Sequence, residues 1–290
     1  MSLESKLPYF IEYFEKELEA GLNEYLDKCP NSILEGVKYA TESGGKRIRP
    51  ILLLSTAEML GLNLERVKNY AISIELIHSY SLVHDDLPAM DNDDYRRGKL
   101  STHKKFGEAM GILIGDALLN MSFDFLLKDE DCSLNALKAS KKISELAGIL
   151  GMIGGQVLDV DSTNLPIEEN TLYDIYEKKT AGLIVASLVA PSLLAGGKYY
   201  TELYEIGKNV GFLFQITDDI LDIESDLPVL GKKIGKDEEA GKITAINVFG
   251  IKKAKERAEY HYNIAKNLLL KIPSSDFLLF LLDKIYKRNK

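Results

Sequence analysis

Cysteine is scarce in this sequence, which has only Cys29 and Cys132 among its 290 residues. Neither lies in a spacing typical of a metal site, and two cysteines so far apart do not form a disulfide framework. We therefore expect two reduced thiols and a cytoplasmic protein. The N-terminus lacks a basic start followed by an apolar stretch, so no signal peptide is predicted.

Basic residues are also fewer than acidic residues. The sequence holds 36 Lys and Arg against 44 Asp and Glu, which gives a net charge of -8. Proteins that bind nucleic acids usually carry a basic surface. Nucleic acid is therefore not an expected partner, although local basic pockets for phosphate groups are compatible with this balance.

Long uncharged runs are few. One of them, from Thr180 to Gly197, has 18 residues without a charge, which is at the lower edge of what can cross a bilayer. The run contains Ser187, Pro191 and Ser192, so a helix buried inside a helical protein explains it better. No membrane span is predicted.

Strict alternation of apolar and polar residues is absent, so almost no sheet is expected. Phe14, Leu18, Leu22 and Tyr25 share one face of a first helix that we expect Pro30 to end. Another helical face is formed by Val67, Ala71, Ile74, His78, Leu82 and Asp85. Further helices are expected at about 107–127, 133–160, 168–195, 200–223, 239–271 and 275–288. The sequence therefore predicts an all-α protein, with residues 1–290 in one domain that forms a single large helical bundle.

Two clusters of aspartates lie in or beside apolar helices: DDLPAMD at residues 85–91 and DDILD at residues 218–222. Asp218 and Asp222 are one helical turn apart, and two carboxylates about 4 Å apart repel by roughly 4 kcal/mol at an effective dielectric of about 20. Their neighbours are Phe, Ile and Leu, and no Lys or Arg lies one turn away, so we expect a metal cation to offset the repulsion. A solvated acidic face is the alternative, and we prefer it for Asp93 and Asp94.

Carboxylate oxygens are hard ligands, which argues against zinc and copper. A calcium loop that began at Asp91 would need Gly and Glu where the sequence has Arg96 and Thr102. Magnesium takes one or two carboxylates and fills its other positions with water and substrate phosphate oxygens. The two clusters therefore predict magnesium and a phosphorylated ligand.

Basic segments lie before the first acidic cluster and after each of the two clusters. The segments are GGKRIRP at residues 44–50, RRGK at residues 96–99, Lys178 and Lys179, and the Gly-Lys pairs that end at Lys232 and Lys242. Each one alone is more typical of a solvated helix face. Together they form an alternating order of acidic and basic motifs, in which Arg and Lys are suited to phosphate oxygens. The spacing differs from that of a nucleotide-binding phosphate loop.

These motifs resemble those of the trans-isoprenyl diphosphate synthase family. The segment from His78 to Asp91 with RRGK is similar to the family's first aspartate-rich motif, and QITDDILD at residues 215–222 is similar to the second. GGKRIRP, GGQ at residues 154–156 with Asp159, Lys179 with Thr180, and Lys232 follow in the family's order. The resemblance covers residues 40 to 245 and is closest to the short-chain bacterial members that make farnesyl diphosphate. It implies an all-α bundle with a central active-site cavity, and a homodimer.

The resemblance also implies roles for individual residues. Carboxylates of the two motifs would converge to hold three Mg²⁺ ions on the allylic diphosphate: Asp85, Asp86, Asp91 and Asp218, with Asp219 and Asp222 through water. Cations that grip this diphosphate would be Arg96, Lys179 and Lys232. Isopentenyl diphosphate would be bound by Lys46, Arg49, His78 and Arg97, and Lys242 would also bind substrate. The developing allylic cation would face Thr180, Gln215 and the carbonyl of Lys179.

Product length is expected to depend on Tyr80 and Ser81, which lie one turn before Asp85. A bulky aromatic here resembles a floor that stops growth at fifteen carbons, so Tyr80 favours farnesyl diphosphate. The alternative is a core tyrosine. Three other functions stay open: a geranylgeranyl diphosphate synthase, a terpene cyclase, and a non-catalytic partner subunit of a prenyl synthase. The basic C-terminus at residues 287–290 is expected to fray into solvent.

Overall fold

The structure is a computed structural model that describes residues 2–42, 44–128, 133–163, 168–224 and 243–289. The chain divides into two compact units. Unit 1 comprises Met1–Leu54 and Asn63–Cys132, and unit 2 comprises Ser55–Leu62 and Ser133–Lys290. The expected single domain over residues 1–290 stays a prediction, and each unit is described by itself.

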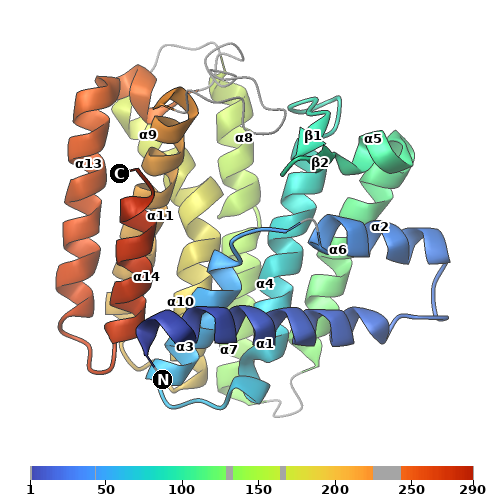
Figure 1. Cartoon of the computed structure of the whole chain (residues 1–290), viewed down its shortest axis with the longest axis horizontal. Helices are drawn as coiled ribbons and strands as arrows, with labels where there is room; N and C mark the ends of the chain where they lie inside the picture. Colours follow the sequence, from blue (N-terminus) through green and yellow to red (C-terminus); the bar gives the residue numbers. More distant parts are fainter. Residues whose placement is uncertain (1, 43, 129–132, 164–167, 225–242, 290) are drawn as a thin grey trace. The chain divides into compact units, whose positions relative to one another are not determined.

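Unit 1 is helical except for one short hairpin. Helix α4 packs against α1, α2 and α6, and α1 crosses α4 steeply in Figure 1. The elements are α1 (Leu3–Asn23), α2 (Asn31–Glu42), the first part of α3 (Ile48–Met59), α4 (Leu64–Asp85), β1 (Tyr95–Arg96), β2 (Lys99–Leu100), α5 (Thr102–Phe106) and α6 (Glu108–Leu127). The strands β1 and β2 pair in antiparallel fashion.

The helix boundaries of unit 1 follow local chemistry. The Asn63 side chain accepts a hydrogen bond from the backbone N–H of Glu65 at 3.0 Å and caps α4. Helix α4 ends before Pro88, as expected. The first helix differs from the prediction because α1 ends at Asn23, well before Pro30, and Tyr25 lies in the following turn.

Unit 2 is also helical. Helices α11, α13 and α14 run side by side in Figure 1. The elements are the end of α3, α7 (Leu134–Ala147), α8 (Met152–Ser162), α9 (Glu169–Ile175), the π-helical turn η1 (Tyr176–Ala181), α10 (Gly182–Leu194), α11 (Tyr200–Glu224), α13 (Ala245–Leu269), α14 (Asp276–Tyr286) and the 3-10 turn η2 (Lys287–Asn289).

Three of the expected helices of unit 2 are interrupted. Among the described residues, the predicted helix at 239–271 runs from Ala245 to Leu269, and Gly250 interrupts it with a left-handed φ of 73°. The predicted helix at 133–160 breaks between α7 and α8, where a Cβ at Gly151 would lie 1.9 Å from the carbonyl oxygen of Leu146. The predicted helix at 168–195 changes pitch in η1. Apart from β1 and β2, the described elements are helices and turns, so the predicted all-α class is confirmed.

The uncharged run at 180–197 is a core helix, since every residue from Gly182 to Ser192 in α10 is buried. By length and composition alone, two other segments could cross a membrane. They are Glu108–Leu127 and Leu134–Ser162, with 44% and 33% of their tested windows buried. Core helices of water-soluble proteins pass the same test, so these segments are weak support for a membrane protein.

Candidate active-site residues

The first aspartate motif folds into a compact turn at the end of α4. The backbone N–H of Asp91 donates to the carbonyl of Asp85 at 2.8 Å, and that of Asp93 donates to the carbonyl of Asp86 at 3.1 Å. Asn92 has a left-handed backbone with φ of 51°, a conformation that Asn adopts more readily than most residues. The turn therefore brings the backbones of Asp85 and Asp91 together, and both side chains are half-buried.

Arg96 pairs with the buried carboxylates of this motif. Its Nε lies 3.0 Å from Asp86 Oδ1, and Asp86 is 2% exposed. Its Nη2 also lies 3.6 Å from Asp93, which is buried. The preferred interpretation of Asp93 as a solvated acid is therefore wrong, because the hairpin brings Arg96 over it. Asp94 is exposed, as expected, and pairs with Lys104 at 2.9 Å.

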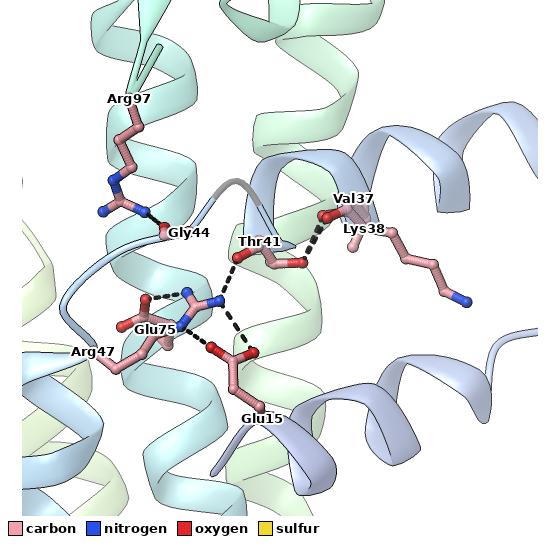
Figure 2. A network of polar contacts seen from close by, with 8 residues as sticks. All are labelled: Glu15, Val37, Lys38, Thr41, Gly44, Arg47, Glu75 and Arg97. Atoms are coloured by element: carbon pink, nitrogen blue, oxygen red, sulfur yellow. Dashed lines mark hydrogen bonds and ion pairs between the residues drawn. The ribbon is translucent and has the colours of Figure 1, made fainter. Parts of the chain in front are cut away.

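The basic segment at residues 44–50 is anchored by Arg47 (Figure 2). Its Nε lies 2.6 Å from Glu15, its Nη1 lies 2.7 Å from Glu75, and its Nη2 donates to the carbonyl of Thr41 at 2.7 Å. Arg47 is 3% exposed, with a left-handed φ of 47°. Arg47 has no predicted role, because both of its acidic partners are distant in sequence.

A positively charged neighbourhood forms in unit 1 around His78. Arg97 donates to the carbonyl of Gly44 (Figure 2). A Cβ at Gly45 would lie 2.6 Å from Arg97 Nη1, so only glycine lets the guanidinium approach this closely. Burial lowers the pKa of His78 well below its ordinary value, and the charges of Arg49 and Arg97 lower it further. Unit 1 thus brings these predicted phosphate-binding residues together, whereas the side chain of Lys46 is exposed.

Tyr80 lies beside the first aspartate motif. It is 6% exposed, and its ring meets the ring of His84 edge-on, with centroids 5.8 Å apart. Burial and the negative charge of Asp85 raise the pKa of Tyr80 to about 12. The hydroxyl of Ser81 donates to the carbonyl of His78 at 2.9 Å. Both predicted chain-length residues therefore lie at the end of α4 that carries the aspartates.

Unit 2 presents its candidate residues from η1, a π-helical turn of the kind often found at functional sites. A Cβ at Gly155 of α8 would lie 2.3 Å from the backbone N of Lys179. A Cβ at Gly211 of α11 would lie 2.2 Å from the Cβ of Ala181. The two glycines therefore allow α8 and α11 to pack closely against η1.

Lys179 forms an ion pair with Asp159 of α8. Its Nζ lies 2.6 Å from Oδ2 of Asp159, which is one turn beyond Gly155 and 9% exposed. In the described part of the chain, no hydrogen-bond partner is found for the buried Oε1 of Gln156. The GGQ motif thus serves to fit α8 against η1, and Asp159 holds Lys179.

A chain of hydrogen bonds joins η1 to α11 and α13. The hydroxyl of Thr180 donates to Gln215 Oε1 at 2.8 Å, and Gln215 Nε2 donates to Asp219 Oδ1 at 3.0 Å. Asp219 Oδ2 accepts from the hydroxyl of Tyr176 and, at 2.7 Å, from the backbone N–H of Ala245. The sequence analysis gave Tyr176 no role, because it lies 43 residues before Asp219.

Arg288 from the C-terminal turn pairs with the second aspartate motif. Its Nη2 contacts Asp218 Oδ1, and its guanidinium lies 4.4 Å from the centre of the Phe214 ring. The expectation that residues 287–290 fray into solvent is therefore wrong for Arg288, whose side chain is 14% exposed. Arg288 is 70 residues from Asp218, so the sequence near Asp218 does not predict this pair.

These carboxylates suit a hard divalent cation. In the residues that the structure describes, no group of three or more His, Cys, Asp or Glu side chains is arranged as a metal site. The available donors are carboxylate oxygens, and a Lys or Arg already lies against Asp86, Asp159 and Asp218. Such a donor set fits Mg²⁺. The metal-binding roles stay predictions for Asp85, Asp86, Asp91, Asp218, Asp219 and Asp222. The predicted phosphate ligands Lys232 and Lys242 lie outside the described residues.

Comparison with known proteins identifies the family. A family model described as polyprenyl synthetase matches residues 30–269. The farnesyl diphosphate synthase of Micrococcus luteus is 38% identical over 294 residues, which cover 99% of this chain and 100% of the relative. A geranyltransferase from Legionella pneumophila is similar in structure, with a TM-score of 0.86, 32% identity, and coverage of 99% of this chain and 97% of the other.

A geranyltransferase from Helicobacter pylori, solved in complex with magnesium and isoprenyl diphosphate, is also similar. Its TM-score is 0.81 at 31% identity, with coverage of 95% of this chain and 97% of the other. The family model spans most of the chain, and the relatives match it over nearly their full length. The chain therefore belongs to the polyprenyl synthetase family of prenyltransferases.

Proposed function

We propose that the protein condenses isopentenyl diphosphate with dimethylallyl or geranyl diphosphate, and that the product is farnesyl diphosphate. The observation that carries the proposal is the division of charge within unit 1. Arg49, Arg97 and His78 form a cationic neighbourhood suited to one diphosphate, while Asp85 and Asp91 are suited to the magnesium of another. Two separate groups of opposite charge in unit 1 favour a protein that binds two diphosphates over one that binds a single diphosphate.

In unit 1, the aspartate turn and Arg96 would hold the allylic diphosphate. The cationic neighbourhood would bind isopentenyl diphosphate, and Lys46 would add a further positive charge. Because the pKa of His78 is lowered, its imidazole is neutral at pH 7 and can donate an N–H to a phosphate oxygen.

In unit 2, Asp218 and Asp222 would supply further carboxylates, and Lys179 would bind a phosphate oxygen of the allylic substrate. Lys179 is held in place by Asp159 at 2.6 Å, so its ammonium group is already oriented. Thr180 and Gln215 would direct oxygen atoms at the allylic carbons. The predicted roles of Lys232 and Lys242 remain part of the proposal.

The reaction needs stabilisation of charge more than it needs a base. Magnesium supplies positive charge to the leaving diphosphate when the allylic C–O bond breaks. Arg96 and Lys179 would add charged hydrogen bonds to the same oxygens, and these strengthen as negative charge develops. The double bond of isopentenyl diphosphate then attacks the allylic cation, and the departing diphosphate accepts the proton that is lost.

A two-substrate assay tests the proposal. Purified protein with Mg²⁺ should release pyrophosphate only when isopentenyl and allylic diphosphates are both present, and chromatography should show fifteen-carbon chains. Release without isopentenyl diphosphate would indicate a cyclase, and no release would indicate a partner subunit. Twenty-carbon chains would identify a geranylgeranyl diphosphate synthase.

Metal removal and one variant sharpen this test. EDTA should abolish turnover, and added Mg²⁺ should restore it. Asp218→Asn should lower kcat/KM by about 10²-fold or more, the range for losing one group that stabilises transition-state charge. Asp174→Asn, an exposed carboxylate on α9, is the matched control and should stay within about twofold of wild type.

We also propose three Mg²⁺ ions per active site and a homodimer in the cytoplasm. Exposed apolar side chains on and before α8 support association: Ile149 is 79% exposed, Leu150 70%, Val157 52% and Val160 55%. Contiguous apolar patches commonly mark an interface. Light scattering should report a dimer for wild type and a monomer for the Leu150→Lys, Val157→Lys double variant. Co-sedimentation of wild type with lipid vesicles would point to a membrane surface instead.

A further inference from the structure

Asp219 differs from the other aspartates of its motif in what surrounds it. It is 4% exposed, and both of its carboxylate oxygens accept hydrogen bonds. Oδ2 accepts from the Tyr176 hydroxyl and from the backbone N–H of Ala245, and Oδ1 accepts from Gln215. A carboxylate whose two oxygens both accept from protein donors is poorly placed to bind a metal. It is well placed to orient the side chains that donate to it.

The neighbour that Asp219 orients is the Gln215 amide. An amide can turn over, exchanging its oxygen and its NH₂. A carboxylate has only acceptor atoms, so Asp219 requires the NH₂ of Gln215 to face it. The Thr180 hydroxyl could either donate or accept and imposes no direction of its own. Asp219 therefore selects the orientation in which Gln215 Oε1 points to Thr180.

This selection also fixes the hydroxyl of Thr180. The hydroxyl donates its single proton to Gln215 Oε1 at 2.8 Å, so only its oxygen lone pairs remain available to another group. Tyr176 holds the other end of the chain, because its hydroxyl accepts from Ala245 N–H at 2.8 Å and donates to Asp219. Burial raises the pKa of Tyr176 well above its ordinary value, which keeps this donor protonated.

We propose that Asp219 and Tyr176 are positioning residues, which orient Gln215 and Thr180 so that both present oxygen to the allylic cation. This inference rests on the proposed function, in which those two residues face the reacting carbons. A reversed amide would direct N–H groups at a growing positive charge and would raise the barrier. The role replaces the predicted metal role of Asp219.

Asp219→Asn is the first test. The Tyr176 hydroxyl and the Ala245 N–H both donate to one side of the side chain, so the new amide keeps its oxygen there and turns its NH₂ toward Gln215. Gln215 must then reverse. We expect kcat to fall about 10²-fold, the usual loss when one stabilising dipole is misdirected. The KM for isopentenyl diphosphate and the Mg²⁺ concentration at half-maximal rate should each stay within about twofold.

A compensating variant gives the decisive readout. In Asp219→Asn with Gln215→Glu, the carboxylate at position 215 accepts from the new amide and from Thr180, and the net charge of the pair is restored. We expect kcat to recover at least about tenfold over Asp219→Asn. Gln215→Glu alone opposes two carboxylates and should be worse than the double variant. That comparison serves as the test should Asp219→Asn fail to fold.

Two results would overturn the inference. One is a double variant no better than either single variant. The other is an Asp219→Asn enzyme whose kcat recovers when Mg²⁺ is raised, as expected of a metal ligand. The matched control is Asp283→Asn, which breaks a similar bond, 2.7 Å from the Tyr262 hydroxyl, and should leave kcat within about twofold. If wild type fails to couple the two substrates, the proposed function fails instead, and this is seen before any variant is made.

Discussion

Arg47 is a buried cation that pairs with Glu15 and Glu75. It lies in the sequence between Lys46 and Arg49, which are predicted to bind phosphate. Glu75 is nearly as buried as Arg47, with side-chain exposures of 3% and 2%. Removing one partner of such a pair leaves the other charge without compensation in a desolvated place. Arg47 thus contributes to the shape of the basic segment, whereas Lys46 and Arg49 contribute charge.

We expect Arg47→Met to lower the free energy of unfolding by about 3–5 kcal/mol, the range for breaking a buried ion pair. Urea denaturation followed by circular dichroism measures it. Arg257→Met is the control, because Arg257 and Glu169 form an exposed pair 2.8 Å apart with side chains 42% and 48% exposed. The control should lose less than about 1 kcal/mol, and an equal loss in both variants would contradict the argument.

Tyr80 is the residue that we predict to limit product length. Truncating this buried ring should open space near the aspartate turn, so Tyr80→Ala should shift products from fifteen carbons to twenty or more. Chromatography of the dephosphorylated products measures the change. Ile74→Ala, which removes a buried side chain from another face of α4, is the control for general loosening. Fifteen-carbon chains alone from Tyr80→Ala would show that the ring is an ordinary core residue.

At the scale of elements, the sequence predicts helices well wherever the signal is local. The 3.6-residue spacing locates α6 and α11 to within one residue at each end. Interruptions are predicted less well. The break between α7 and α8 and the π-helical turn η1 depend on close packing against other helices, which a one-dimensional pattern does not contain.

The site shows the same division. The aspartate motifs and the basic segments can be predicted from the sequence, because each consists of neighbouring residues. The partners Tyr176 and Arg288 cannot be predicted in this way, because each contacts its aspartate from a distant segment of the chain. The predicted convergence of the two aspartate motifs stays a prediction.

The packing of η1 against α8 gives a prediction at this scale. Gly155→Ala would place a methyl group 2.3 Å from the backbone N of Lys179, and the obstacle is backbone that cannot rotate away. We expect a loss of about 1–3 kcal/mol of stability from overpacking, with a fall in kcat as Lys179 and Thr180 are displaced. Thermal unfolding and steady-state kinetics measure both effects. Asp161→Asn, at an exposed position of the same helix, should change neither appreciably.

At the scale of the whole molecule, His261 makes stability depend on pH, in addition to His78, whose pKa is also lowered. Burial lowers the pKa of His261 to about 4, with smaller contributions from Arg257 and Lys208. The unfolded chain has an ordinary pKa of about 6.5, so between these values it binds a proton that the folded chain does not. Stability is therefore full above about pH 6.5 and falls as the pH drops toward 4.

Protonation of His261 is expected to lower the free energy of unfolding by about 3 kcal/mol between pH 6.5 and pH 4, at about 1.4 kcal/mol for each pKa unit. Urea denaturation at several pH values, followed by the helical circular dichroism signal, measures it. His261→Gln can still donate to Asn209 Oδ1, which lies 2.8 Å from the imidazole, but cannot titrate. Its unfolding free energy should decline less between pH 6.5 and 4, and a decline as steep as that of wild type would rule out His261 as the cause.

The contact between Arg288 and Asp218 joins the C-terminal turn to the second aspartate motif. The guanidinium places positive charge beside a carboxylate that is predicted to bind metal. An affinity tag joined after Lys290, or cleavage of the last few residues by a protease, would alter this contact. A changed metal affinity or turnover in a C-terminally tagged preparation would then reflect disturbance of this contact, and an N-terminal tag is the safer choice for biochemistry.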